Sequence, residues 1–250
     1  MKVATSIILA RRQSLAELIE NHRYLPLSEV CSRLGISEAT ARRDLRILAS
    51  ERKITRTYGG ALGTFDATFT SFADRRAIDH EVKARLAQKA LGFVRENTTC
   101  FFDAGTTIFA LAEALHRQPV ARLCAVTNSI PVAEMLGRCP EGEVHLLGGR
   151  FLQRQSLLLG AAARRSAKRW KFDFVFLGAE GFSKKGIWAS EPEVASFQQA
   201  VLAQARQVIV CAHAAKCDRE TGVFLAPWSA KFKLITNMSP VQMTRRHLPS

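Results

Sequence analysis

Two different patterns of apolar positions follow one another along the chain. In residues 11–62, apolar side chains recur at helical spacing in short runs with tight connections, which is typical of small helices. From about residue 81 onward, short apolar runs typical of buried strands alternate with helical stretches. We therefore expect an N-terminal domain in residues 1–62, a connection in residues 63–80 and a larger domain in residues 81–250.

The N-terminal domain begins with two short predicted helices. The stretch RRQSLAELIENH has its apolar residues at helical spacing, which predicts the first helix. The second helix is expected over residues 28–34, with Ser28 as its N-cap and Gly35 just past its end.

A third predicted helix carries the candidate chemistry of this domain. Ser37 stands at its N-cap position, and Ala41, Leu45 and Leu48 share one face that would pack on the first two helices. The opposite faces carry polar and basic side chains, namely Thr40, Arg42, Arg43 and Arg46. Two helices joined by a short turn, the second with basic residues near its N-terminus, form the helix-turn-helix arrangement, whose second helix enters the DNA major groove.

A basic ribbon is predicted directly after this helix. The segment RKITRTYGGAL alternates along a strand and then turns at Gly59 and Gly60, so the domain would be a winged helix. The alternative is a small helical cap with a solvated basic face. In the winged-helix interpretation, the residues expected to contact DNA are Ser37, Thr40, Arg42, Arg43, Arg46, Lys53, Arg56 and Tyr58.

In the larger domain, the stretch TTCFFDAGTT predicts a buried strand that ends in a polar loop, followed at once by a helix. Ligands bind at such strand ends in α/β sheets, and a helix N-terminus favours an anion. Gly105 would let the chain approach a ligand closely, while Thr106 and Thr107 offer hydroxyl groups. Asp103 would repel a nearby phosphate, so it better suits sugar hydroxyls or a role in orienting the loop.

The same pattern of an apolar run followed by a polar loop recurs along the rest of the chain. Further apolar runs end in small or polar residues in LCAVTNSIPVAEML, VHLLGGRF, FDFVFLGAEGF and QVIVCAHAAK. Taken singly, each loop is compatible with ordinary turn chemistry. Together they predict an α/β domain built on a mostly parallel sheet, with one pocket at its carboxyl edge.

Two motifs of the N-terminal domain resemble those of the DeoR family of bacterial transcription regulators. They are the run SEATARRDL, from Ser37 to Leu45, and the ending RTYGGA, from Arg56 to Ala61. A β-branched aliphatic residue is usual in the family where this chain has Ala41. The stretch 81–237 is similar in order and spacing to the effector domain of the same family.

The resemblance implies a repressor of a sugar-metabolism operon that binds double-stranded operator DNA as a homo-oligomer, either a dimer or a tetramer. It also implies a C-terminal fold like that of ribose-5-phosphate isomerase and CoA-transferases, which binds a phosphorylated sugar or related metabolite as effector. The effector residues it implies are Asp103, Gly105, Thr106, Thr107, Asn128, Gly149 and Lys216, and His213 is a further candidate.

Three positions depart from the family pattern and keep other functions open. His213 and Ala215 stand where an aspartate and a polar residue are usual, and Gln198 stands where a lysine is common. His213 is therefore either a ligand contact or a structural hydrogen-bonding residue. One alternative function is a scaffold that no longer senses a ligand. Another is a sugar-phosphate isomerase, for which Asp103, Glu193 and Lys216 are the candidate acid and base groups.

Composition supports a polyanionic partner and an ordinary globular protein. The net charge is +14, while hydrophobic residues make up 47% and charged residues 23% of the 250 positions. Residues 150–171 contain seven basic residues and no acidic one, which fits a solvated face or a contact with DNA or another anion.

The cysteines and the N-terminus indicate a cytoplasmic protein. The apolar stretch 3–10 is too short for a membrane span and leads to no cleavage site. The six cysteines form no CxxC pair or zinc-like cluster, so we expect buried thiols in a reducing compartment and no metal or cofactor. A redox pair of Cys211 and Cys217 is the alternative.

Overall fold

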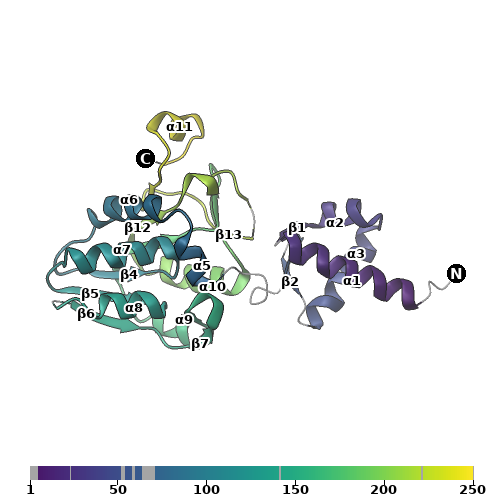
Figure 1. The fold of residues 1–250 in the computed structure, drawn as a ribbon, viewed down its shortest axis with the longest axis horizontal. Helices are drawn as coiled ribbons and strands as arrows, with labels where there is room; N and C mark the ends of the chain where they lie inside the picture. The colour runs from purple at the N-terminus through teal and green to yellow at the C-terminus, as the bar shows by residue number, and fades with distance from the viewer. Residues whose placement is uncertain are drawn as a thin grey trace. The chain divides into compact units, whose positions relative to one another are not determined.

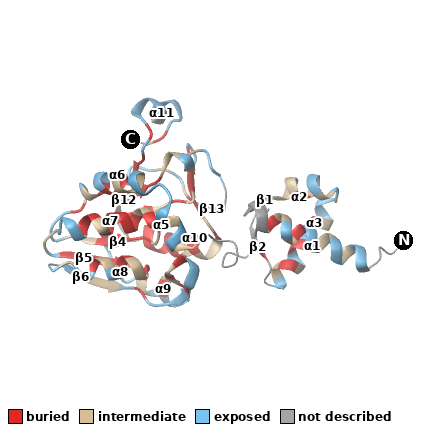
Figure 2. Ribbon diagram, viewed as in Figure 1, coloured by how far each residue is buried: buried red, intermediate tan, exposed pale blue. Residues whose placement is uncertain are grey.

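The computed structural model describes residues 5–22, 24–51, 54–57, 60–63, 71–140, 142–220 and 222–249. The chain divides into two compact units, Met1–Phe69 and Thr70–Ser250, each with an apolar core of its own (Figures 1 and 2). No helix among the described residues has the length and apolar character of a membrane span.

The first unit is a winged helix-turn-helix. Its core joins the three helices, with Leu15 and Ile19 of the first helix and Leu45 of the third at most 2% exposed. The predicted ribbon is present as two antiparallel strands, and a third strand, which the sequence pattern did not predict, pairs with them in the order β1-β3-β2. The elements are α1 (Thr5–His22), β1 (Tyr24–Pro26), α2 (Leu27–Leu34), α3 (Glu38–Ser50), β2 (Ile54–Thr57) and β3 (Gly60–Gly63).

The predicted start of α2 at Ser28 is wrong. The helix begins at Leu27, Pro26 occupies the N-cap position, and no side chain caps this end. The reason is the unpredicted strand β1, in which Pro26 pairs with Gly60, so the chain passes from strand to helix without a separate cap residue. The predicted end of α2 is confirmed, since Gly35 adopts the left-handed conformation at φ 61° and donates its N–H to the carbonyl oxygen of Cys31.

The second unit is built on a parallel six-stranded sheet of order β14-β12-β9-β4-β5-β6. Every neighbouring pair in this sheet is parallel, so all six carboxyl ends lie along one edge. The strands are β4 (Thr99–Phe102), β5 (Leu123–Thr127), β6 (Gly142–Leu146), β9 (Phe172–Gly178), β12 (Ala205–Cys211) and β14 (Phe232–Ile235).

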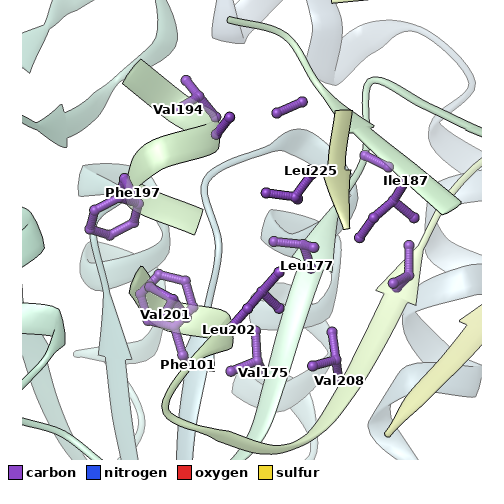
Figure 3. Packing of buried hydrophobic residues seen from close by; sticks show 14 of the residues in the cluster. Phe101, Val175, Leu177, Ile187, Val194, Phe197, Val201, Leu202, Val208 and Leu225 are labelled. Atoms are coloured by element: carbon purple, nitrogen blue, oxygen red, sulfur yellow. The ribbon is translucent and has the colours of Figure 1, made fainter. Parts of the chain in front are cut away.

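Helices cover both faces of this sheet (Figure 1). On one face, α6 (His80–Leu91), α7 (Thr106–Arg117) and α8 (Ile130–Leu136) bury residues such as Phe102 and Ile209. On the other face, α9 (Ala161–Ala167) and α10 (Pro192–Leu202) cover a second apolar cluster. Figure 3 shows Val175 and Leu177 of β9 in the same apolar space as Phe197 and Val201 of α10. These two cores hold the sheet rigid, and therefore fix the positions of the loops at its carboxyl edge.

Part of the stretch 63–80, predicted to be a connection, is a helix of the second unit. Helix α5 (Phe72–Ala77) packs on α7, where the Phe72 ring lies edge-on to Phe109 at a centroid distance of 5.4 Å. A guanidinium nitrogen of Arg76 also lies 2.7 Å from a carboxylate oxygen of Glu113.

Shorter elements complete the second unit. A hairpin and a three-stranded antiparallel sheet of order β10-β11-β13 lie outside the main sheet. They and the remaining helices are β7 (Arg150–Leu152), η1 (Gln153–Gln155), β8 (Leu157–Leu159), β10 (Gly181–Ser183), β11 (Gly186–Ala189), η2 (Ala214–Lys216), β13 (Val223–Ala226) and α11 (Pro240–Arg245).

Candidate functional site

The exposed face of α3 is the candidate DNA-reading surface of the first unit. Ser37 caps the helix as predicted, because its Oγ accepts a hydrogen bond from the backbone N–H of Thr40 at 3.3 Å. The predicted apolar stripe of Ala41, Leu45 and Leu48 is buried at 2% exposure or less. Packing of that stripe leaves the opposite side of α3 in solvent.

Basic side chains occupy that open side of the helix. Arg42, Arg43 and Arg46 are all exposed. Arg42 lies 2.5 Å from Glu38 in an ion pair whose side chains are 50% and 62% exposed. Such an exposed pair contributes under about 1 kcal/mol, so Arg42 can exchange Glu38 for a phosphate at little cost. Of the predicted wing contacts, Arg56 lies on β2, and Lys53 and Tyr58 lie outside the described residues.

A buried carboxylate fixes the orientation of α3. The side chain of Asp44 is fully buried, and it lies 2.7 Å from Arg11 and 2.8 Å from Arg12 of α1. Burial alone would raise the pKa of Asp44, but the hydrogen bonds and positive charges of the two arginines outweigh it, and the pKa is lowered. No role for Asp44 was predicted from the sequence. Its position three residues after Ala41, on the apolar stripe, is the signal that marks it.

The carboxyl edge of the main sheet gathers the predicted effector residues. Asp103 follows β4, Asn128 follows β5, Gly149 lies beyond β6, and His213 and Lys216 follow β12. The parallel ladders bring these strand ends to one edge, as the sequence pattern predicted.

Asp103 lies at the centre of this edge and is only 3% exposed. Its Oδ2 accepts hydrogen bonds from Nε2 of Gln198 on α10 at 2.9 Å and from the backbone N–H of Gly178 at 3.4 Å. Burial raises the pKa of Asp103 to about 7, against the smaller opposing effect of these hydrogen bonds. The carboxyl group therefore changes its protonation state near neutral pH.

This raised pKa predicts how stability depends on pH. Between the ordinary value of 3.8 and about 7, the folded state holds a proton on Asp103 that the unfolded state has lost. Stability must therefore fall as the pH rises through this range. We expect Asp103→Asn to remove most of that decline, because an asparagine side chain does not titrate in this range, while its Oδ1 can still accept the hydrogen bond from Nε2 of Gln198. Urea unfolding of both proteins between pH 4 and pH 8 measures the difference, and parallel curves would contradict it.

Helix α7 begins at this edge beside open space. Gly105 is its N-cap residue with φ 153°, a conformation that other residues rarely adopt, and no side chain caps this end. A Cβ at Gly105 would meet no atom of the described residues within 4 Å. The first backbone N–H groups of α7 have no partner within the helix, and such groups favour an anion. Thr106, which is buried, and the half-buried Thr107 add hydroxyl groups at this end of the helix.

Buried acceptors at the same edge lack partners. Among the described residues, Oδ1 of Asn128 and Oε1 of Gln198 accept no hydrogen bond, although these residues are 1% and 5% exposed. The other half of each amide is engaged, since Nδ2 of Asn128 donates to the carbonyl oxygen of Leu158 and Nε2 of Gln198 donates to Asp103. The two free oxygens suit the hydroxyl groups of a small polar ligand.

Lys216 adds a positive charge to this edge. Its Nζ donates a hydrogen bond to the carbonyl oxygen of Ala179 at 2.5 Å, which holds the ammonium group near the end of β9. Burial lowers the pKa of Lys216, and the positive charges of Arg75 and Arg219 act in the same direction, while Glu180 opposes them. An anion bound here would offset that mutual repulsion.

His213 and Gly149 serve the local backbone. Nδ1 of His213 accepts the N–H of Ala215 at 2.9 Å, and Nε2 lies 3.8 Å from Asp79. A Cβ on Gly149 would lie 2.3 Å from the carbonyl oxygen of Leu159, so the close approach of this loop to β8 requires glycine. In these contacts both residues shape the edge, which is the structural interpretation left open for His213.

The comparisons with known proteins agree with this arrangement. A family model described as the DeoR C terminal sensor domain matches residues 78–238, and one described as the DeoR-like helix-turn-helix domain matches residues 11–64. The chain belongs to the DeoR family. It is accordingly a transcription regulator with a helix-turn-helix domain and a sensor domain.

Relatives within the DeoR family align over nearly the full chain. The transcriptional repressor GlcR of Bacillus subtilis is 28% identical over 93% of this chain and 89% of its own length. The glycerol-3-phosphate regulon repressor of Escherichia coli is 28% identical over 92% of this chain and 91% of its own length. Among solved structures, ribose 5-phosphate isomerase A from Methanocaldococcus jannaschii aligns with 56% of this chain and 55% of its own at 12% identity and a TM-score of 0.42.

The structure adds two residues to the edge that the DeoR resemblance did not supply. Gln198, noted from the sequence only as a departure, contacts Asp103 directly. Thr236 follows β14, is 4% exposed, and its hydroxyl has no partner among the described residues. The short alternating stretch FKLI directly ahead of Thr236 is the weak sequence signal that could have identified it as another strand end.

The basic stretch 150–171 is partly engaged within the sensor domain. Arg150 lies 2.5 Å from Glu193, Arg164 donates to Ser196 at 3.1 Å, and Lys171 donates to Gln204 at 2.8 Å. These contacts tie the stretch to α10 and the turn after it, which favours the interpretation as a partly solvated face.

Cys211 and Cys217, the alternative redox pair, are both free thiols.

Proposed function

We propose that this protein represses transcription by binding double-stranded operator DNA through α3 and its wing, and that a phosphorylated sugar or related metabolite bound at the carboxyl edge of the sheet changes that affinity. The observation that carries the proposal is the combination, in one chain, of a basic exposed helix-turn-helix face with an edge that offers both anion donors and hydroxyl acceptors.

The DNA half of the proposal rests on charge and shape. The first turns of α3 project Arg42 and Arg43 from a helix whose apolar side is buried, and DNA supplies the phosphates and guanine edges that arginine binds best. A two-fold homo-oligomer would present two such helices to successive major grooves, about 34 Å apart. The assembly is therefore proposed to be at least a dimer.

The effector half rests on complementary groups at the sheet edge. The N-terminus of α7 and Lys216 favour a phosphate, and the free oxygens of Asn128 and Gln198 favour hydroxyl groups. The relative from Escherichia coli is named for glycerol 3-phosphate, a molecule with both features. The departures at His213 and Gln198 leave a polar lining, because Gln198 itself binds Asp103.

An enzymatic role is the second candidate, and the lining argues against it. Isomerisation needs a base that reaches the substrate carbon. Asp103 is hydrogen-bonded by Gln198 and Gly178, Glu193 is paired with Arg150, and Lys216 donates to the carbonyl oxygen of Ala179. We propose that the domain binds without turnover.

A thermal-shift screen of the full chain against phosphorylated sugars and polyols tests the effector proposal. We expect a ligand that raises the melting temperature, while its unphosphorylated counterpart does not. The same ligand should shift the binding of DNA selected from a random pool. Lys216→Met should lower the affinity for the ligand at least about tenfold. Lys168→Met, at an exposed position just after α9, should leave that affinity unchanged. Absence of binding across the panel would favour the scaffold alternative, and turnover would favour the enzyme.

A further inference from the structure

A cluster of metal-binding side chains lies on strands β5 and β6, outside the effector site. Cys124 of β5 pairs in register with Glu143 of β6, and His145 follows two residues later on the same strand. Side chains two apart on a strand point to the same face, so the register places all three on one side of the sheet. The predicted effector residues lie beyond the carboxyl ends of β4, β5, β6 and β12, whereas the three donors lie within β5 and β6.

The geometry of the three donors is compact. One thiol sulfur, one carboxylate oxygen and one imidazole nitrogen lie within 4.8 Å of one another. Nε2 of His145 lies 2.9 Å from Oε1 of Glu143. The His145 ring packs on Trp170 at a centroid distance of 4.7 Å, which restricts its rotation and keeps the nitrogen on the side of Glu143.

We propose that Cys124, Glu143 and His145 bind a zinc ion. A thiolate, an imidazole and a carboxylate are the three ligand types that zinc takes in proteins, and ligand lengths of about 2.0–2.3 Å place the donors of one ion within the spacing seen here. Binding moves the proton of the Cys124 thiol to solvent. The ion then replaces the direct contact between His145 and Glu143, and its two positive charges balance the thiolate and the carboxylate.

The cluster lies where an ion can reach it from solvent and can link two neighbouring strands. Strand β6 is the last in the sheet order, and the side chains of His145 and Glu143 are 35% and 70% exposed, so an ion and a fourth ligand from water can reach it. Zinc would join the edge strand to β5 through side chains as well as through the ladder. The sequence did not indicate this site because Cys124 and His145 are far apart in the chain and meet only through the strand register.

Cobalt titration of the full-length protein tests the proposal without any DNA or effector. We expect one equivalent of cobalt per chain, a near-ultraviolet thiolate-to-cobalt charge-transfer band, and displacement of that band by zinc. Cys124→Ser should abolish the band, and His145→Ala should weaken binding by about tenfold or more. The matched controls Cys139→Ser and His116→Ala should leave both unchanged.

Stability provides a second and independent measurement. Zinc should raise the melting temperature of the wild-type chain but not of Cys124→Ser, because an ion that binds only the folded state stabilises it. Far-ultraviolet circular dichroism shows that each variant is folded before titration. The proposal is overturned if the charge-transfer band persists in Cys124→Ser, if no band forms at saturating cobalt, or if zinc shifts the melting temperature of both proteins equally.

Discussion

Replacing Arg42 and Arg43 together with alanine is expected to lower the affinity for operator DNA by at least about a hundredfold. Each arginine that contacts a phosphate or a guanine edge contributes about 1–3 kcal/mol, and a two-fold assembly would lose each contact twice. The fold should survive, because both side chains lie on the exposed side of α3 and the pair that Arg42 makes among the described residues is with the exposed Glu38.

Fluorescence anisotropy with a selected DNA duplex at several salt concentrations measures this loss. The variant should also show a shallower dependence of affinity on salt, since fewer counterions are released when fewer phosphates are contacted. Arg117→Ala combined with Arg138→Ala removes the same charge from exposed positions of the sensor domain and serves as control. Equal affinities of the two double variants would mean that α3 does not read DNA and that net charge alone explains binding.

The sequence predicted the parts of the fold that local patterns specify. Ala41, Leu45 and Leu48 recur at helical spacing, which predicts a helix with one buried face. Buried strands such as β4 and β5 can be predicted because each is a short apolar run followed by polar residues. Once the strands are known to alternate with helices, a parallel sheet follows and its carboxyl ends must share an edge. The place of Asp103 and Asn128 on that edge was therefore predictable.

The remaining features depend on contacts between residues far apart in the chain. Strand β1 is three residues long and exists through its pairing with β3, so its sequence has no periodicity to detect. Gln198 looks like the loss of a charge until its contact with Asp103 is seen, across 95 positions of the chain. Register between β5 and β6 likewise decides that Cys124 meets His145, and no motif records it.

The last prediction concerns Asp44, the buried partner of Arg11 and Arg12. We expect Asp44→Ala to lower the free energy of unfolding of the winged helix by about 2–4 kcal/mol, because removing the carboxylate leaves the positive charges of Arg11 and Arg12 without a negative charge to balance them. The cost falls below the top of the usual range since the arginine side chains are 22% and 21% exposed and regain water.

Hydrogen exchange of the full-length protein measures this effect on α1 and α3 separately from the sensor domain. Glu29→Ala is the matched control, because its pair with Arg33 is exposed on both sides, at 41% and 42%, and should contribute under about 1 kcal/mol. Similar exchange in the two variants would contradict the role of Asp44 in fixing α3.

The lowered pKa of Asp44 sets the pH at which its contribution is lost. The folded state keeps this carboxylate ionised below the ordinary value of 3.8, so the stabilisation is fully present above that value and is lost as the pH falls through the folded pKa. Asp44→Asn should lack this acid-dependent loss while the sensor domain keeps its own pH response. Because Asp44 ties α1 to the back of α3, the same substitution should also weaken DNA binding without removing any group that contacts DNA. A variant in which α3 exchanges faster but operator affinity is unchanged would show that the ion pairs of Asp44 are not needed for DNA binding.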